Sequence, residues 1–185
     1  MWVACAAPTD FATETGCHVN SSLIFDPAVC PYGFDRIGCK FFGVSTPDIA
    51  GATFFYQAQR QSARSIIKVP FDELPEAPPS PTLIFSIGRC GSTLLHKALE
   101  VAGVRAISEP DIYTQAAYRQ PAEPWLGEAL GRAAELMPYD FIKLRADCCC
   151  GPLLIAGAFV APRVMVVLRD PVDWAVARRR LAPDT

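Results

Sequence analysis

After residue 81, short apolar runs alternate with segments of helical periodicity, and this alternation constrains the fold more than any other feature of the chain. The run 82–87, Thr-Leu-Ile-Phe-Ser-Ile, is typical of a strand buried on both faces of a sheet. Apolar residues then recur at helical spacing from Leu94 to Ala102, and Gly103 follows as a C-terminal cap. Because strands that alternate with helices form parallel sheets between helical layers, we expect a three-layer α/β fold.

The same alternation continues to residue 180. It predicts further strands over 104–108, 140–145 and 163–168, and helices over 123–137, 148–160 and 170–180. Pro171 suits the first turn of the last helix, because the first N–H groups of a helix need no partner within it.

The segment 1–74 lacks this pattern. A helix over 54–64 and a short strand over 66–71 are predicted there, and we expect the whole segment to be an irregular extension that packs on the core. The sequence Pro-Glu-Ala-Pro-Pro-Ser-Pro at 75–81 predicts a stiff, extended connector. The α/β core is therefore expected over 82–185.

Composition limits the partners and the compartment. Half of the residues (51%) are hydrophobic, which indicates a globular protein, and a net charge of −2 gives no electrostatic reason to expect nucleic acid or a membrane surface as partner. Eight cysteines contain no CxxC pair and only two histidines are present, so we expect no metal site. The N-terminus has no secretory signal pattern, and the longest uncharged stretch, 148–162, is short for a membrane span, so we expect a cytoplasmic protein.

The turn after the run 82–87 is a candidate anion site. It consists of Gly88, Arg89, Cys90, Gly91, Ser92 and Thr93. The glycines let the backbone approach a ligand closely, and the helix that follows offers free N–H groups and the positive end of its dipole. The two hydroxyls and the Arg89 guanidinium add donors suited to phosphate or sulfate oxygens. Cys90 lies near the helix start, where thiolates are favoured.

This turn differs from a Walker A loop, which has four residues between its glycines and a lysine before the Ser/Thr. Only two residues separate Gly88 from Gly91, and no lysine precedes Ser92. A P-loop kinase or NTPase is therefore the less favoured interpretation.

A second turn follows the strand at 163–168, with the sequence Arg169-Asp-Pro. Parallel strands end at the same edge of a sheet, where ligands of such folds bind. We therefore expect Arg169 to hold a second anion, although a salt bridge to a neighbouring aspartate is the structural alternative.

Together the two turns resemble the donor-binding motifs of the sulfotransferases that use 3′-phosphoadenosine 5′-phosphosulfate. Arg89-Cys-Gly-Ser-Thr resembles the 5′-phosphosulfate loop of that family, and Arg169-Asp-Pro-x-Asp resembles its 3′-phosphate motif. The resemblance covers residues 81–180, just over half of the chain. It implies a P-loop-type parallel sheet, a loop from Gly88 to Thr93 that cradles the phosphosulfate, and the nucleotide as co-substrate without a metal.

The resemblance also suggests residues for the transfer step. Arg145 stands where many members have a histidine base, whereas Glu109 lies at about the spacing of the glutamate base of protein-tyrosine sulfotransferases. Glu109 is therefore the candidate base and Lys143 a candidate cation at the donor site, although Glu109 could also be a helix-start charge. His96 falls off the apolar face of its helix, and we expect it to be solvated or packed.

Two departures affect the expected activity. Ala177 replaces the serine that the family has eight residues after the motif arginine, and family members run considerably further than this chain. The expected function is transfer of a sulfuryl group to an unknown hydroxyl or amine acceptor, on a small molecule or a protein. The alternative is a truncated nucleotide-binding fold without turnover.

Overall fold

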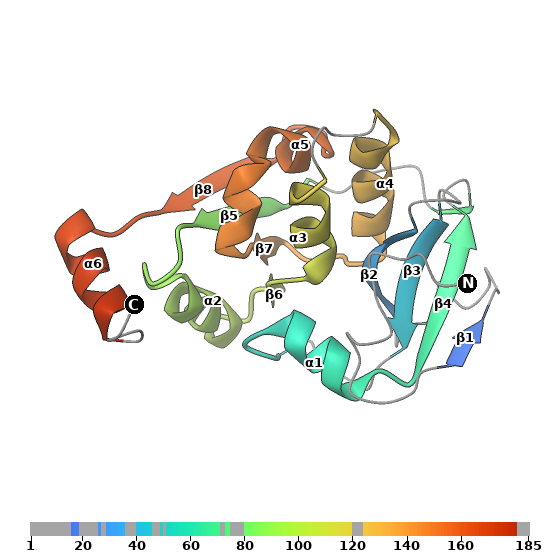
Figure 1. The fold of residues 1–185 in the computed structure, drawn as a ribbon, viewed down its shortest axis with the longest axis horizontal. Coiled ribbons are helices and arrows are strands. Elements are labelled where there is room, and N and C mark those ends of the chain that lie inside the picture. Colours follow the sequence, from blue (N-terminus) through green and yellow to red (C-terminus); the bar gives the residue numbers. More distant parts are fainter. Residues whose placement is uncertain are drawn as a thin grey trace.

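The computed structural model describes residues 16–18, 26, 29–35, 40–45, 49, 51–70, 73–74, 80–119 and 124–180. These residues form two four-stranded sheets that lie side by side (Figure 1). The C-terminal sheet is parallel, with the order β6-β7-β5-β8. Its strands are β5 (Thr82–Ser86), β6 (Ala106–Ser108), β7 (Phe141–Lys143) and β8 (Arg163–Val167). The predicted α/β fold with a parallel sheet is confirmed.

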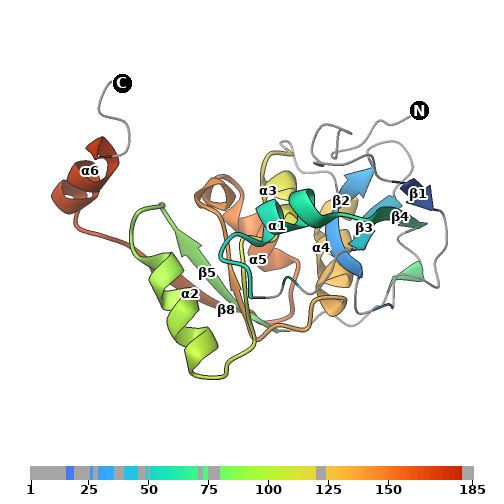
Figure 2. The same cartoon turned by 90° about the horizontal axis from the view of Figure 1, so that it is seen from below.

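Helices cover both faces of this sheet (Figure 2). Leu83 and Phe85 of β5 point to one face and belong to the main core, which is completed by α3 (Asp111–Ala117), α4 (Pro124–Glu135) and α5 (Pro152–Gly157). The helix α2 (Ser92–Val101) lies on the other face, where the polar Ser86 and Lys143 lie next to the buried Ile84.

The predicted helix over 148–160 is wrong as a single element. A 3₁₀ turn, η4 (Ala146–Cys150), ends at Gly151, and α5 begins with Pro152 at its first position. Proline has no N–H to continue the preceding turn, so the chain restarts there. The helix α6 (Pro171–Arg179) begins as predicted, and none of its residues is buried.

The predicted apolar face of α2 is only partly confirmed. Leu95 and Leu99 are half-buried but Leu94 is exposed, whereas Ser92 and His96 are buried against the sheet. The helix starts directly after the glycine turn, and that start sets which residues face the sheet. Ser92 and His96 therefore occupy positions that face the sheet.

The N-terminal segment forms a sheet, which corrects the expectation of an irregular extension. Its order is β1-β4-β3-β2, from β1 (Gly16–His18), β2 (Val29–Asp35), β3 (Lys40–Ser45) and β4 (Ser65–Pro70), with α1 (Phe55–Ser62) before β4. The predicted helix and strand at 54–71 are thus confirmed. The ladder between β2 and β3 shifts register between Pro31 and Gly33, and such a bulge breaks the alternation that a strand prediction needs.

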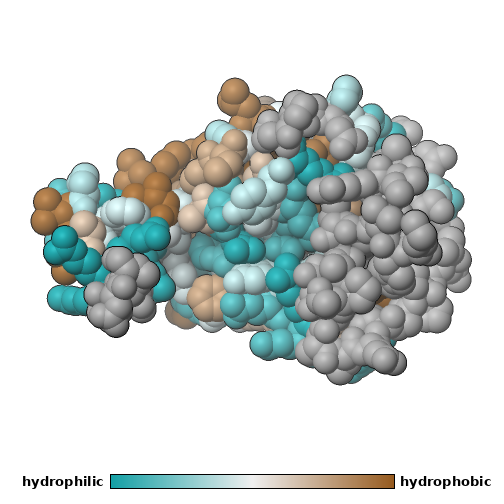
Figure 3. All heavy atoms as spheres, in the orientation of Figure 1, coloured by the Kyte–Doolittle hydropathy of each residue, from teal (hydrophilic) through white to brown (hydrophobic). Residues whose placement is uncertain are grey.

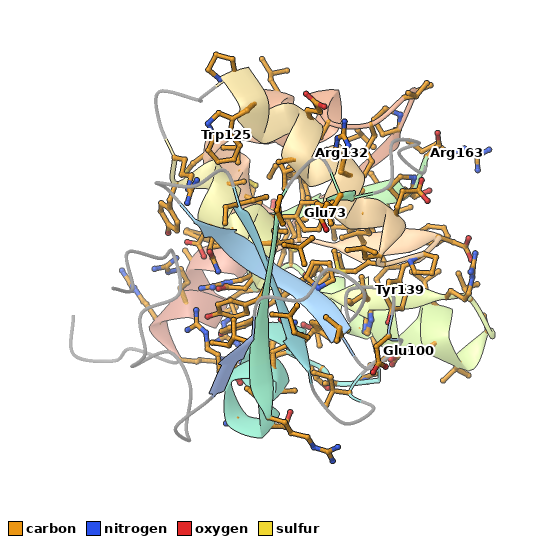
Figure 4. The ribbon with its side chains drawn as sticks, turned by 90° about the vertical axis from the view of Figure 1, so that its right-hand side faces the viewer. Glu73, Glu100, Trp125, Arg132, Tyr139 and Arg163 are labelled. Atoms are coloured by element: carbon orange, nitrogen blue, oxygen red, sulfur yellow. The ribbon has the colours of Figure 1, made fainter. Side chains whose placement is uncertain are left out.

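The two sheets are joined by contacts from α3 and α4. Gln115 Nε2 donates to the Tyr32 carbonyl at 2.8 Å, and Trp125 packs edge-on against Phe34 with ring centroids 5.9 Å apart. Arg132 Nη1 donates to the Leu74 carbonyl at 3.1 Å; Trp125 and Arg132 both project from α4 (Figure 4). Most of the predicted connector, residues 75–79, lies outside the described residues.

The described helices are all too short or too polar to cross a membrane.

Candidate anion-binding site

The loop between β5 and α2 is held in left-handed backbone conformations. Gly88, Arg89 and Gly91 have φ values of 73°, 54° and 91°. Only glycine adopts this region without strain, so Arg89 costs about 1 kcal/mol or more relative to an extended residue. The conformation allows the loop to turn sharply from the strand into the helix.

The start of α2 is open to a ligand. Its N-cap residue is Gly91, which has no side chain. The first N–H groups of the helix therefore receive no hydrogen bond from a capping side chain. Ser86 Oγ donates to Ser92 Oγ at 3.1 Å, and both serines are buried. This bond holds the first residue of the helix against the end of β5, next to the uncapped N–H groups.

The second turn is built differently. Asp170 Oδ1 accepts hydrogen bonds from the N–H groups of Val172 and Asp173, at 2.9 and 3.3 Å, and so caps α6 itself. The N-terminus of α6 is therefore occupied. Any anion bound on this side must be held by side chains.

The α6 region is tied to the glycine loop. Arg169 Nη1 donates to the carbonyl of Arg89 at 3.3 Å, and Trp174 Nε1 donates to the carbonyl of Gly88 at 3.0 Å. These bonds hold two loop carbonyls toward α6. Arg169 is therefore in contact with the loop that precedes α2, 80 residues earlier in the chain.

A cavity of about 540 Å³ lies between the loop and α6. It is lined by Arg89, Gly91, Ser92, Thr93, Arg169, Asp173, Val176, Ala177 and Arg180. Arg89 and Arg169, predicted from separate motifs, thus line one cavity. Among the described lining residues, three arginines face a single aspartate, so the cavity favours an anionic ligand.

Arg180 was missed by the sequence analysis. It lines the cavity with Asp173, Val176 and Ala177, at positions i, i+3, i+4 and i+7 of one helical face. The same spacing, counted from the Arg-Asp-Pro motif, could have identified it.

Glu109 and Lys143 lie outside the lining of this cavity and contact each other. Lys143 Nζ forms an ion pair with Glu109 Oε1 at the carboxyl ends of β7 and β6, and both side chains are largely buried. Glu109 has a φ of 62°, and its N–H donates to the Lys143 carbonyl at 2.7 Å. The ring of Phe54 lies over the pair, 5.9 Å from Lys143 Nζ.

Arg145 belongs to a polar network. It pairs with Asp111 at 3.3 Å and Asp147 at 3.1 Å, and its guanidinium lies 4.4 Å from the centre of the Tyr56 ring. Asp111 also accepts from Arg60 at 2.8 Å. Arg145 therefore joins the core to the N-terminal segment.

Two titratable side chains outside the cavity lining are buried. His96 is packed between α2 and the sheet, with its Nδ1 3.8 Å from Glu100 Oε2, and burial lowers its pKa. Burial raises the pKa of the Cys148 thiol to about 12. Cys90, in the loop itself, is partly exposed and free.

Family models, curated proteins and solved structures were each compared with the chain, and none matches it. A functional assignment therefore depends on the cavity and on the residues around it.

Proposed function

We propose that the cavity between the glycine loop and α6 binds 3′-phosphoadenosine 5′-phosphosulfate, and that the protein is a sulfotransferase with a P-loop-type nucleotide site. The observation that carries the proposal is that Arg89 and Arg169 line one cavity beside an uncapped helix start. A ligand with two separate anionic groups fits two arginines that come from different turns.

The position of the cavity in the sheet agrees with this proposal. The next two strands in sequence, β6 and β7, lie on one side of β5, whereas β8 lies on its other side. Ligands of open α/β sheets bind outside the carboxyl ends of strands where the strand order reverses in this way. The glycine loop follows β5 and Arg169 follows β8.

In the proposed reaction, a sulfuryl group moves from the phosphosulfate to an acceptor oxygen or nitrogen, and negative charge develops on the leaving phosphate. The N–H groups at the start of α2, the Arg89 guanidinium and the Thr93 hydroxyl would stabilise that charge. Arg169 and Arg180 would hold the 3′-phosphate at the other side of the cavity. Glu109 stays the candidate base. The acceptor would approach from the β6 side and replace Lys143 as the partner of the Glu109 carboxylate.

A second candidate is nucleotide binding without turnover. Ala177 lines the cavity without a hydroxyl, at the position where the resembled family has a serine. Binding and turnover therefore need separate tests.

Calorimetric titration with 3′,5′-adenosine bisphosphate tests the binding site. Arg89→Gly removes the guanidinium but permits the observed φ of 54°, so the loop keeps its shape. Loss of a hydrogen bond to a charged group costs about 1.5–3 kcal/mol, which predicts a loss of affinity of roughly 10- to 150-fold for Arg89→Gly and for Arg169→Gln.

Arg163→Gln is the matched control, because Arg163 lies at the opposite end of β8 and projects outward (Figure 4). It should leave the affinity unchanged. Tighter binding of ATP with magnesium than of the bisphosphate, or equal losses in all three variants, would overturn the proposed site.

Turnover is tested by the release of the bisphosphate from the phosphosulfate donor in the presence of phenol and amine acceptors. Acceptor-dependent release that disappears in Glu109→Gln, while bisphosphate affinity stays intact, supports the enzyme. Binding without release with any acceptor supports the second candidate.

A further inference from the structure

The strand β8 forms an unpaired edge of the parallel sheet. It pairs with β5 from Arg163 to Val167, and within the described part of the chain no strand pairs with its other side. Val164 and Val166 lie beside Leu83 and Phe85 on the same face of the sheet, because their register partners share a face. Leu83 and Phe85 are buried, whereas Val164 and Val166 are 53% and 59% exposed.

The opposite face of β8 is open as well. Met165 is 39% exposed there, and Leu168, directly after the strand, is also exposed. Brown, hydrophobic surface gathers over β8 and the start of α6 in Figure 3. The apolar core of the sheet therefore stops at a strand whose own residues are apolar on both faces.

Natural sheets protect their edges with charges, prolines, bulges or covering loops. Among the described residues, β8 has none of these within its pairing region: its only charge is Arg163 at the first position, and its register with β5 is unbroken over all 5 residues. An edge of this kind is a template for pairing with another strand.

We propose that β8 pairs with the β8 of a second copy of this chain, antiparallel around a two-fold axis at Met165, to form a dimer with a continuous sheet. In this pairing Val164 lies opposite Val166 of the second copy, and Arg163 lies opposite an apolar residue. No charge faces a like charge, and apolar cross-strand pairs stabilise antiparallel ladders. The strand is thus complementary to itself, as a two-fold interface requires.

The apolar area available can be compared with that of a standard interface. Val160, Val164, Met165, Val166, Leu168 and Val172 are each between 39% and 71% exposed. A fully exposed aliphatic side chain offers roughly 60–120 Å², so these residues supply roughly 200–400 Å² per copy. A standard interface buries about 800 Å² per partner, a little over half of it apolar. The dimer is therefore expected at the small end of stable interfaces, so its association is tested over a wide range of concentration.

Sedimentation velocity of the full chain over about 1–200 µM tests the proposal. We expect the mass to rise with concentration from 20.1 kDa toward twice that value. Val166→Lys, at the centre of the edge, should stay a monomer throughout. Val101→Lys is the matched control, because Val101 is 91% exposed on α2, away from β8, and it should dimerise like the unmodified chain.

A monomer at every concentration would overturn the proposal, including the case in which a different polypeptide covers the edge. Unchanged dimerisation of Val166→Lys would overturn it equally. Should that variant fail to fold, hydrogen exchange of the unmodified chain decides. The amides of 163–167 that point away from β5 must become more protected as concentration rises, and constant protection refutes the pairing.

Discussion

Two glycines offer a test of the loop backbone in which one chemical change has opposite effects. Gly91 precedes α2 with a φ of 91°, and Gly127 lies inside α4 with ordinary helical geometry. A Cβ atom added at either position would meet no atom within 4 Å. Replacement by alanine therefore changes the backbone preference at both positions without a steric clash.

The expected magnitudes follow from that preference. At Gly91, alanine must adopt a left-handed conformation, which costs about 1–2 kcal/mol and exceeds the gain from a less flexible unfolded chain. At Gly127, alanine fits the helix and lowers the entropy of the unfolded state, which stabilises by about 0.4–1 kcal/mol. The two variants should differ by about 2 kcal/mol in the free energy of unfolding.

Thermal and urea denaturation of the two variants and the unmodified protein measure this difference. For a chain of this size about 1 kcal/mol corresponds to about 2–4 °C in Tm, so Gly91→Ala should melt lower and Gly127→Ala higher than the unmodified protein. Gly91→Ala should also weaken bisphosphate binding, because a changed backbone at residue 91 would point the first N–H groups of α2 away from the anion. A neutral or stabilising Gly91→Ala would refute the left-handed loop and the anion site built on it.

Three further outcomes are expected. Asp170→Ala should remove the cap of α6 and cost about 1 kcal/mol, seen as faster hydrogen exchange in 171–179, whereas Asp170→Asn should retain most of the protection. Burial holds the pKa of His96 below 6.5, so the unfolded chain binds the proton more readily and the free energy of unfolding should fall as pH drops below that value. The urea midpoint of His96→Phe should therefore depend less on pH between 7.5 and 5.5 than that of the unmodified protein. Cys148, buried and with a raised pKa, should resist iodoacetamide in the native state, while the exposed Cys150 is labelled.

The elements of the parallel sheet could be predicted from the sequence because their signals are local. The run 82–87 contains β5, and the glycines at 88 and 91 mark the turn that opens α2. The Asp-Pro pair at 170–171 marks the start of α6, since both residues act within one helical turn. Arg89 and Arg169 could be placed at one sheet edge by the same reasoning.

Features that depend on long-range packing could not be predicted in this way. The burial of His96 in place of Leu94 is decided by how α2 packs on the sheet, and the position of β8 at an edge is decided by strand order. The N-terminal sheet joins β4 to β1 and β3 across the intervening chain, and short strands with Pro31 and Gly33 carry little local signal. Glu109 and Lys143 were proposed for separate roles, and their contact depends on the register of β6 with β7.

The attachment of α6 links the cavity to the stability of the C-terminal region. None of the residues of α6 is buried. Among the described residues, the side chains of Arg169, just before α6, and Trp174, within it, attach this region to the glycine loop by hydrogen bonds. A helix held by so few bonds opens at low free-energy cost. An anion bound between the start of α2 and the arginines that flank α6, Arg169 and Arg180, would add contacts that exist only while α6 is in place. If the proposed site binds its ligand, binding and the docking of α6 are thermodynamically coupled, and a mutation that loosens α6 should weaken binding even when it removes no contact with the ligand.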